Sequence, residues 1–270
     1  MRILIASDLD QTLIYSRRAT RLSVPAPELV AVESRDGAPT SFLTSRAAGV
    51  LATLGASATL VPVTTRVPEQ LARVRLPGPP APFAIASNGA DLYVAGELDR
   101  AWSARVTASL AGGYPLSAVW EHIGHLCRPE FTRKLHNARE LFCYAVVRPE
   151  HLPAGFVDDV GAWAAERGWR TSLQGRKLYW VPEVLTKSSA VAEVAVRLQA
   201  DLVLAAGDSL LDLDLLLRAD RGVHPAHGEL FESGWAAPHV TRTTAVGVLA
   251  GEQIVDWFAE QVAASLAGAA

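Results

Sequence analysis

Two aspartates, Asp8 and Asp10, stand one residue apart in the stretch "DLDQT", directly after the apolar run Ile3–Ala6. Two carboxylates a few ångströms apart repel each other by about 4 kcal/mol at an effective dielectric constant of about 20. One of them would therefore take up a proton unless a positive charge lies between them. The stretch is either a solvated turn or one part of a cation site.

Other polar side chains also stand where apolar runs end. Thr64, with Thr65 as the alternative, follows the run "LVPV", and Asp208 follows "DLVLAAG", with Asp212 four residues later. Lys187 opens the helical pattern that leads into this second run. Because the carboxyl ends of parallel strands share one edge of a sheet, we expect these side chains to meet there.

The charges of this set indicate the kind of chemistry. A hard divalent cation removes the repulsion between carboxylates, and donors that are all oxygens favour Mg²⁺ over zinc. A calcium loop of the EF-hand type beginning at Asp8 is excluded, since Leu13 and Ala19 stand where glycine and glutamate are required. Magnesium facing hydroxyl, amide and lysine donors is typical of a phosphate site, where one carboxylate can attack phosphorus and form an aspartyl-phosphate.

The elements that position these residues follow an alternating order. Short apolar strands alternate with helical patterns over residues 1–90 and 183–270, which indicates an α/β fold with a doubly wound parallel sheet. In residues 91–182, helical patterns are interleaved with "ELFCYAVV" and a hairpin that turns at Gln174-Gly175, and we expect an inserted α+β domain. For the polar segment 15–40 we expect a long loop.

The stretch "DLDQT", the Thr64 strand end, Lys187 and "GDSLLD", in this order, resemble the four motifs of the haloacid dehalogenase superfamily of phosphatases. The resemblance implies that residues 1–90 and 183–270 form a Rossmann-like catalytic core. The insertion at 91–182 resembles the large substrate-selecting cap of the Cof-type, sucrose-phosphatase and phosphomannomutase-like branch. The resemblance therefore implies a Mg²⁺-dependent phosphatase of a small phosphomonoester, for which a sugar phosphate or a related metabolite is expected.

The same resemblance implies a role for each residue of the set. Asp8 would be the nucleophile, and Asp10 would be the general acid and base, with its backbone carbonyl on the metal. Thr64 and Lys187 would hold the phosphoryl oxygens. The metal site that it implies comprises Asp8, Asp10, Asp208 and Asp212, with Asp212 supporting either the ion or the lysine.

Substrate recognition is expected at the sheet edge and in the insertion. Asn88, in "SNGADLY", resembles a residue near the substrate where the chain enters the cap, and Arg66 either contacts substrate or braces the cap. Lys134 and Lys177 lie among apolar residues of the insertion. They form either a solvated strand face or groups that select hydroxyls or a second anion of the substrate. Trp180 is expected in the core of the insertion, with stacking on a sugar as the alternative.

Four positions depart from the motifs of the superfamily. Gln11 replaces the usual glycine of the first motif, in a turn that tolerates the change, and Thr65 and Ser188 replace glycines of the second and third motifs. Leu211 stands where this branch commonly has asparagine, which removes a polar contact near the metal or the phosphate. A catalytically weakened regulatory protein that binds a metabolite is therefore one alternative. A phosphomutase that uses the same aspartates is the other.

The composition argues against several other classes of function. A net charge of −3 over 270 residues and a pI near 6.2 give no electrostatic reason to expect nucleic acid or an anionic membrane as partner. Two cysteines, Cys127 and Cys143, are too few for a disulfide framework and indicate a reducing compartment. With no signal-peptide pattern and no membrane-spanning run, we expect a cytoplasmic protein that binds a small phosphorylated metabolite. The sequence does not indicate its oligomeric state.

Overall fold

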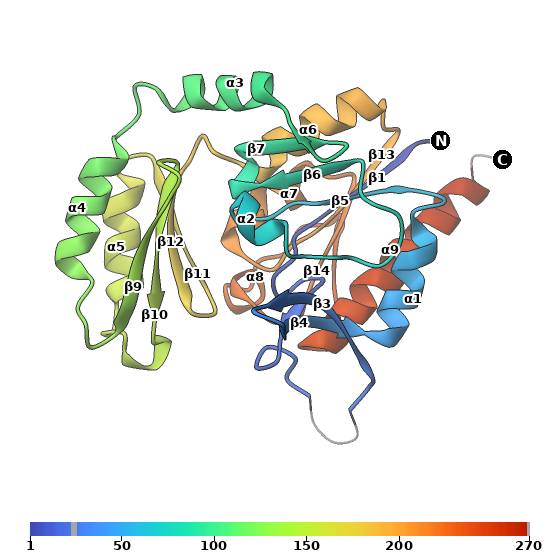
Figure 1. The fold of residues 1–270 in the computed structure, drawn as a ribbon, viewed down its shortest axis with the longest axis horizontal. Helices are drawn as coiled ribbons and strands as arrows, with labels where there is room; N and C mark the ends of the chain where they lie inside the picture. The colour runs from blue at the N-terminus through green and yellow to red at the C-terminus, as the bar shows by residue number, and fades with distance from the viewer. Residues whose placement is uncertain (23–25, 269–270) are drawn as a thin grey trace.

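The central sheet is built from five short and mostly apolar runs: β1 (Ile3–Ser7), β5 (Thr59–Pro62), β13 (Leu202–Ala206), β14 (Arg221–His224) and β15 (Val240–Arg242). Figure 1 shows this sheet in a computed structural model of the chain, which describes residues 1–22 and 26–268. The strands are parallel, in the order β15-β14-β13-β1-β5. In β1, which lies between β13 and β5, Ile5 pairs with Leu204 on one side and with Leu60 on the other.

The helices of this unit are α1 (Ser45–Leu54), α2 (Pro68–Leu71), α6 (Lys187–Leu198), the 3₁₀ turn η3 (Leu210–Asp212), α7 (Leu213–Arg218), α8 (Glu229–Glu232) and α9 (Val248–Ala267). Ile3 and Ile5 of β1 pack in one apolar cluster with α1 and α9, whereas Leu4 and Ala6 pack in another with α6 and α7. Since successive side chains of a strand point to opposite faces, both faces are covered by helices. The predicted doubly wound α/β fold is confirmed. Within the described ranges, no helix combines the length and the apolar character needed to cross a membrane.

A three-stranded antiparallel sheet follows β1 in the chain: β2 (Tyr15–Ser16), β4 (Ala38–Thr44) and β3 (Leu29–Arg35), in this spatial order. The expected long loop over 15–40 is therefore wrong where these strands form, while residues 23–25 lie outside the described ones. The hairpin turns at Asp36 and Gly37, whose φ angles of 51° and 77° suit a tight turn between antiparallel strands. Register shifts between β3 and β4 interrupt the two-residue alternation that would have revealed them in the sequence.

A second antiparallel sheet lies beside β5: β6 (Phe83–Ala86), β7 (Asp91–Val94) and β8 (Glu97–Leu98), with the 3₁₀ turn η1 (Ser87–Gly89) between the first two. Ile85 makes a parallel bridge to Val63, just beyond β5. Leu92 packs in the same apolar cluster as α6, so the start of the segment 91–182 adjoins the core. The division of the chain at residues 90 and 183 stays a prediction.

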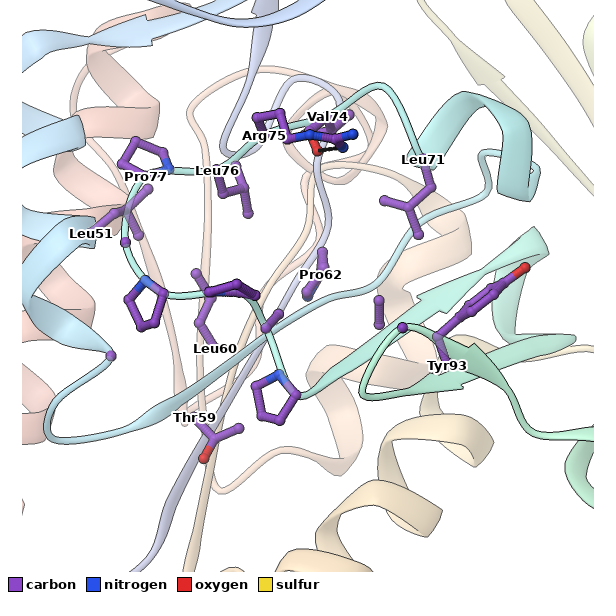
Figure 2. Close-up of a pocket in the computed structure, with 18 of the residues that line it drawn as sticks. Leu51, Thr59, Leu60, Pro62, Leu71, Val74, Arg75, Leu76, Pro77 and Tyr93 are labelled. Atoms are coloured by element: carbon purple, nitrogen blue, oxygen red, sulfur yellow. Dashed lines mark hydrogen bonds between the residues drawn. The ribbon is translucent and has the colours of Figure 1, made fainter.

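The loop between α2 and β6 bounds an apolar pocket of about 830 Å³ (Figure 2). Leu51, Leu60 and Leu76 line it, together with the prolines of segment 77–82. No cluster of acidic or nucleophilic side chains lines this pocket.

The remaining elements form the cap: α3 (Arg100–Leu110), α4 (Leu116–Leu126), β9 (Thr132–Ala138), β10 (Phe142–Val147), the 3₁₀ turn η2 (Pro149–His151), α5 (Phe156–Ala165), β11 (Trp169–Gln174) and β12 (Lys177–Pro182). Its strands make an antiparallel sheet in the order β11-β12-β10-β9. In Figure 1, α4 and α5 lie on the side of this sheet away from the core, and α3 spans the gap between the two parts. The predicted α+β character of the insertion is confirmed.

One face of the cap sheet is turned toward the core. The strand register sets four side chains in a row across this face: His136, Tyr144, Tyr179 and Ser172. Ser172 donates a hydrogen bond to Glu229 of α8, which fixes the direction in which the row points. Trp180 follows Tyr179 and points to the opposite face, where it is fully buried with side chains of α4 and α5. A stacking role on a sugar is therefore wrong for Trp180.

Candidate active site

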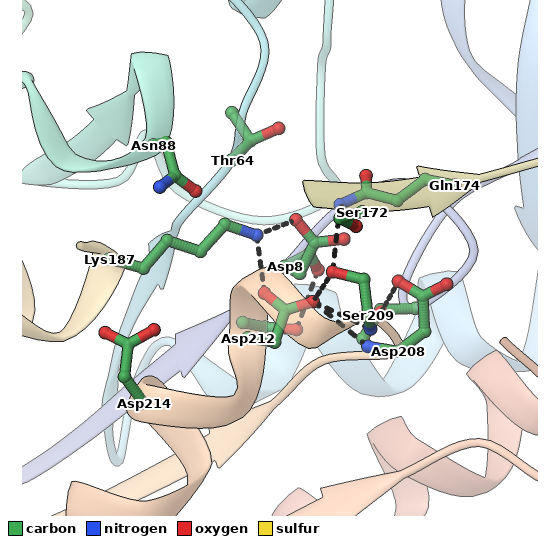
Figure 3. A network of polar contacts seen from close by, with 12 residues as sticks. Asp8, Thr64, Asn88, Ser172, Gln174, Lys187, Asp208, Ser209, Asp212 and Asp214 are labelled. Atoms are coloured by element: carbon green, nitrogen blue, oxygen red, sulfur yellow. Dashed lines mark hydrogen bonds and ion pairs between the residues drawn. The ribbon is translucent and has the colours of Figure 1, made fainter. Parts of the chain in front are cut away.

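Four charged side chains meet at the carboxyl edge of the central sheet, and we call them the core wall: Asp8, Lys187, Asp208 and Asp212 (Figure 3). Asp8 follows β1 directly, Asp208 follows β13 after one glycine, and Lys187 is the first residue of α6. Carboxylate oxygens of the three aspartates lie within 4.8 Å of one another. The structure thus brings together residues that are up to 204 positions apart and that the strand-end argument expected to meet.

The Lys187 ammonium is the positive centre of the core wall. Its Nζ donates to Oδ1 of Asp8 at 2.6 Å and to Oδ1 of Asp212 at 2.5 Å, and the side chain is 1% exposed. Thr186 caps α6 by accepting a hydrogen bond from the backbone N–H of Ser189, which fixes the start of the helix. Burial opposes the charge of Lys187, but Asp212 and Asp8 raise its pKa above the usual value, so it remains an ammonium.

Asp212 holds the loop that carries Asp208. Its Oδ1 accepts from Lys187, and its Oδ2 accepts from the backbone N–H groups of Asp208 and Ser209 at 3.2 and 3.0 Å. Gly207 leaves room for this carboxylate, since a Cβ there would lie 2.3 Å from the Cβ of Asp212. Both oxygens of Asp212 are therefore engaged, and the side chain supports Lys187 and the loop. The Ser209-x-x-Asp212 spacing is a capping box that the sequence already contained.

Lys187 alone does not balance the negative charge of the core wall. Burial raises the pKa of Asp8 to about 7, against the lowering effect of Lys187. Burial, together with Asp8 and Asp212, also raises the pKa of Asp208 well above its usual value. A hard divalent cation beside these oxygens would reverse both shifts, because it stabilises the ionised carboxylates. The donor set therefore fits Mg²⁺, with Asp8 and Asp208 as the available side chains.

Asp10 lies two residues after Asp8 but has a different partner. Arg66 donates to both of its carboxylate oxygens, from Nε at 2.7 Å and from Nη2 at 2.8 Å. Arg66 also pairs with Glu33 of β3 at 3.0 Å, so its contacts lie in the core and not in the cap. Burial alone would raise the pKa of Asp10, but the hydrogen bonds and charge of Arg66 lower it to about 2. Asp10 is therefore ionised in this arrangement.

Thr64 and Asn88 lie beside Lys187 in Figure 3. Thr64 is fully buried, and its hydroxyl accepts a hydrogen bond from the backbone N–H of Arg66 at 3.1 Å. Asn88 adopts a left-handed backbone conformation with φ of 56°, and its Nδ2 donates to the carbonyl of Leu185 at 2.8 Å. Its Oδ1 is buried and has no partner among the described residues. These two side chains adjoin the core wall and contribute polar groups without charge.

Gln11 closes the turn after the two aspartates in a left-handed conformation, with φ of 61°. Its carbonyl accepts from the hydroxyl of Tyr15 at 2.8 Å and lies 2.9 Å from Nε2 of His227. His227 Nδ1 accepts from the backbone N–H of Gly247, so Nε2 carries the proton and donates to Gln11. The amide of Gln11 reaches Oδ2 of Asp208 at 3.4 Å. Gln11 is thus held by its backbone and contacts the carboxylate cluster with its side chain.

The cap contributes a second set of side chains, which we call the cap wall: His136, Tyr144, Lys177 and Tyr179. The His136 ring stacks on Tyr144 at 4.6 Å between centroids, and Tyr144 lies 5.2 Å from Tyr179. The Lys177 ammonium lies 5.8 Å from the Tyr144 ring and 6.0 Å from the Tyr179 ring. Tyr179 and Asp10 raise the pKa of Lys177 against the effect of burial, so it too remains charged. Lys134, on β9, is exposed.

Several contacts across the gap between cap and core were missed by the sequence analysis. Glu229 accepts hydrogen bonds from β11, and Gln174 of β11 donates to Ser209 in the loop of Asp208. No local pattern marks these residues, because their partners depend on how the two parts are placed. Leu211 is fully buried in the apolar cluster of the cap, and its effect on the metal or phosphate contact stays a prediction.

No family model and no curated protein matches the sequence. Solved structures do match. A sucrose-phosphatase from Synechocystis sp. PCC6803, in complex with sucrose and phosphate, has a TM-score of 0.66 at 15% identity, over 96% of this chain and 98% of that one. The C-terminal domain of a trehalose-6-phosphate phosphatase from C. albicans has a TM-score of 0.56 at 11% identity, over 96% and 92%. A phosphatase of the haloalkanoate (HAD) enzyme superfamily from Bacteroides thetaiotaomicron has 0.54 at 16%, over 96% of both chains. At these identities the likeness shows the fold.

Proposed function

We propose that this chain, which has the fold of the haloacid dehalogenase superfamily, is a cytoplasmic Mg²⁺-dependent phosphatase of a small phosphorylated sugar or a related metabolite. The observation that carries the proposal is the setting of Asp8. Its carboxylate follows β1 at the carboxyl edge of the central sheet, bonded to a buried lysine and close to Asp208. A carboxylate held beside an ammonium in this way suits attack on a phosphoryl group.

The residues divide the reaction between them. An oxygen of Asp8 attacks phosphorus, and the bond to the leaving oxygen of the substrate breaks, which gives an aspartyl-phosphate. Lys187 and Thr64 border the space where the phosphoryl oxygens would lie, and Lys187 supplies positive charge there. The free Oδ1 of Asn88 is an acceptor and would suit a hydroxyl of the substrate. Mg²⁺ bound by Asp8, Asp208 and the backbone carbonyl of Asp10 would neutralise the charge that develops on the phosphoryl group.

Asp10 would carry the proton transfers. It gives a proton to the leaving oxygen, and it then takes one from the water that opens the aspartyl-phosphate. With Arg66 on both oxygens, Asp10 is ionised and ready only for the second of these steps. We expect the anionic substrate to draw Arg66 toward itself, which would raise the pKa of Asp10. Asp10 would then take up a proton from solvent water and could act as the acid. This gives Arg66 the substrate contact predicted from the sequence.

The sugar would lie against the cap wall. Aromatic rings and a charged lysine are groups that contact sugar rings and hydroxyls, and the cap wall presents both toward the core. The similar solved structures include proteins described as sucrose-phosphatase and trehalose-6-phosphate phosphatase, which supports a phosphorylated sugar as the substrate class. Lys177 and the more exposed Lys134 are the proposed cap contacts.

Hydrolysis of a panel of sugar phosphates and of a small aryl phosphate, with and without Mg²⁺, tests the proposal. We expect release of inorganic phosphate that requires Mg²⁺, and a loss of about 10³-fold or more in the Asp8→Asn variant. The exposed Asp158→Asn variant in α5 is the matched control and should keep the full rate. Turnover that survives Asp8→Asn would contradict the assignment of the nucleophile. Phosphorus NMR separates hydrolysis from transfer to another hydroxyl, since only hydrolysis releases inorganic phosphate.

A further inference from the structure

Glu229 is the first residue of α8, and its carboxylate lies between the cap strand β11 and the loop 208–212. Its Oε1 accepts the backbone N–H of Leu173 at 2.5 Å, and its Oε2 accepts the hydroxyl of Ser172, both from the cap strand β11. The same Oε2 accepts the backbone N–H of Leu210 at 3.1 Å, from the core. One carboxylate thus receives three hydrogen bonds, two from the cap and one from the core.

The other polar contacts of β11 reach the same loop. Nε2 of Gln174 donates to Oγ of Ser209 at 2.9 Å, as Figure 3 shows, and Nη1 of Arg170 lies 3.3 Å from Oδ1 of Asp214. Together with Ser172, these residues follow the two-residue period of a strand, so one side of β11 makes all three contacts. One side of β11 therefore binds the core at three successive points, which are Ser209, Glu229 and Asp214.

An apolar contact also joins the cap to this part of the core. Leu211 is fully buried and packs in the cluster that contains Leu178 and Tyr179 of β12. Its backbone lies between Leu210, which donates to Glu229, and Asp212, which holds Lys187. The loop that carries the fourth motif is thus bound to the cap on one side and to the carboxylate cluster on the other.

We infer that Glu229 is a positioning residue that fastens the cap strand β11 to the loop 208–212, so that closure of the cap and the geometry of the carboxylate cluster are set together. Each of its three partners is a donor, and only a carboxylate offers acceptors at both ends. A glutamine would turn its NH₂ group toward at least one N–H or O–H donor, whichever way the amide lay. The consequence for catalysis rests on the proposed function, but the coupling of the two parts does not.

Hydrogen–deuterium exchange of the full chain tests the coupling without any need for substrate. In Glu229→Gln and Glu229→Ala we expect the amides of Leu173 and of residues 209–212 to exchange about tenfold faster or more, because both have lost an acceptor that bears a charge. Ser172→Ala, which removes only the cap hydroxyl, should give a smaller change at the same two places. The matched control is Glu232→Gln, on the exposed side of the same helix. It should exchange like the unaltered protein.

Activity then shows whether the coupling serves the reaction. In Glu229→Gln we expect kcat/KM to fall about tenfold for a sugar phosphate that reaches the cap, and less for a small aryl phosphate that does not. Faster exchange in β11 with an unchanged loop 209–212, or in the loop alone, would overturn the proposal. Equal losses for both substrates would overturn the proposed part of cap closure in the reaction, while the exchange result alone decides the coupling. If no substrate is turned over by the unaltered protein, the proposed function fails, and the exchange result still decides the role of Glu229.

Discussion

The core wall and the cap wall each contain one lysine, but the two ammonium groups differ in their partners. In the core wall, Lys187 is 1% exposed and bonds two carboxylates at 2.6 and 2.5 Å. In the cap wall, Lys177 lies near two tyrosine rings and pairs with no carboxylate in the part of the chain that the structure describes. One lysine is therefore part of a fixed network, whereas the other is free to contact a ligand.

Under the proposed function, this difference follows from what each wall would have to do. Attack on phosphorus requires a nucleophile and counter-charges held in place before the substrate arrives, which buried ion pairs provide. Recognition of a sugar requires surfaces that stay unpaired until the ligand supplies the partner, which aromatic faces and a single cation provide.

Replacing Lys187 should damage the core wall more than any other single change discussed. In Lys187→Met, Asp8 and Asp212 stay buried without their cation, and we expect the free energy of unfolding to fall by about 3–5 kcal/mol. Urea denaturation measures the loss, and added Mg²⁺ should recover part of it. The exposed Lys134→Met is the matched control, expected within about 0.5 kcal/mol of the unaltered protein. A loss below about 1 kcal/mol would show that the network is not what holds this wall.

The backbone of the core wall should depend on a neutral histidine. Burial lowers the pKa of His227 from 6.5 to about 4, so the unfolded chain binds a proton more readily than the folded one. The contribution of His227 is therefore present above pH 6.5 and is lost as the pH falls toward 4, by up to about 3 kcal/mol. Urea denaturation between pH 7.5 and 4 should show a weaker pH dependence in His227→Gln. The exposed His151→Gln should keep the original dependence, and a similar slope in all three proteins would refute the assignment.

The core wall was predictable from the sequence because a parallel sheet brings its strand ends together. Asp8, Lys187 and Asp208 are far apart in the chain, yet each stands where an apolar run ends or a helix begins, and this alone places them at one edge. The Ser209-x-x-Asp212 spacing is a further local signal, a capping box that was not used as a prediction but that the structure contains. These features depend on regular secondary structure, which the sequence encodes over a few residues.

The cap contacts and the β3–β4 hairpin were not predictable in the same way. The pairing of Arg66 with Glu33 was not expected, because the strand of Glu33 is concealed by register shifts in the hairpin. Glu229 and Leu211 gained their partners only when the cap was placed on the core. Contacts between the cap and the core leave no periodic signal in either segment, so they could not be predicted from the sequence alone.

The two lysines predicted to bind substrate from the cap should differ in effect. Lys177 stands among the cap-wall rings, whereas Lys134 is exposed on β9, so Lys177→Met should raise KM for a sugar phosphate about tenfold and Lys134→Met should change it less than about threefold. Neither change should alter the free energy of unfolding by more than about 0.5 kcal/mol, since neither lysine belongs to a buried ion pair. Equal KM values in the two variants would contradict the proposed contact between Lys177 and the substrate.

The smallest effect should come from Gln11, where the core wall meets solvent. Its φ of 61° costs a non-glycine residue about 1 kcal/mol, so Gln11→Gly should raise the free energy of unfolding by up to about that amount. The same change removes the amide that reaches Asp208 at 3.4 Å, and the Mg²⁺ concentration for half-maximal binding, measured by calorimetry, should rise about twofold to threefold. Gln11→Asn separates the two effects, because asparagine tolerates the backbone conformation while its shorter side chain does not reach Asp208. A weaker metal affinity in both variants would assign the effect to the side-chain amide. A change only in the glycine variant would assign it to the backbone of residue 11, whose carbonyl is bound by Tyr15 and His227.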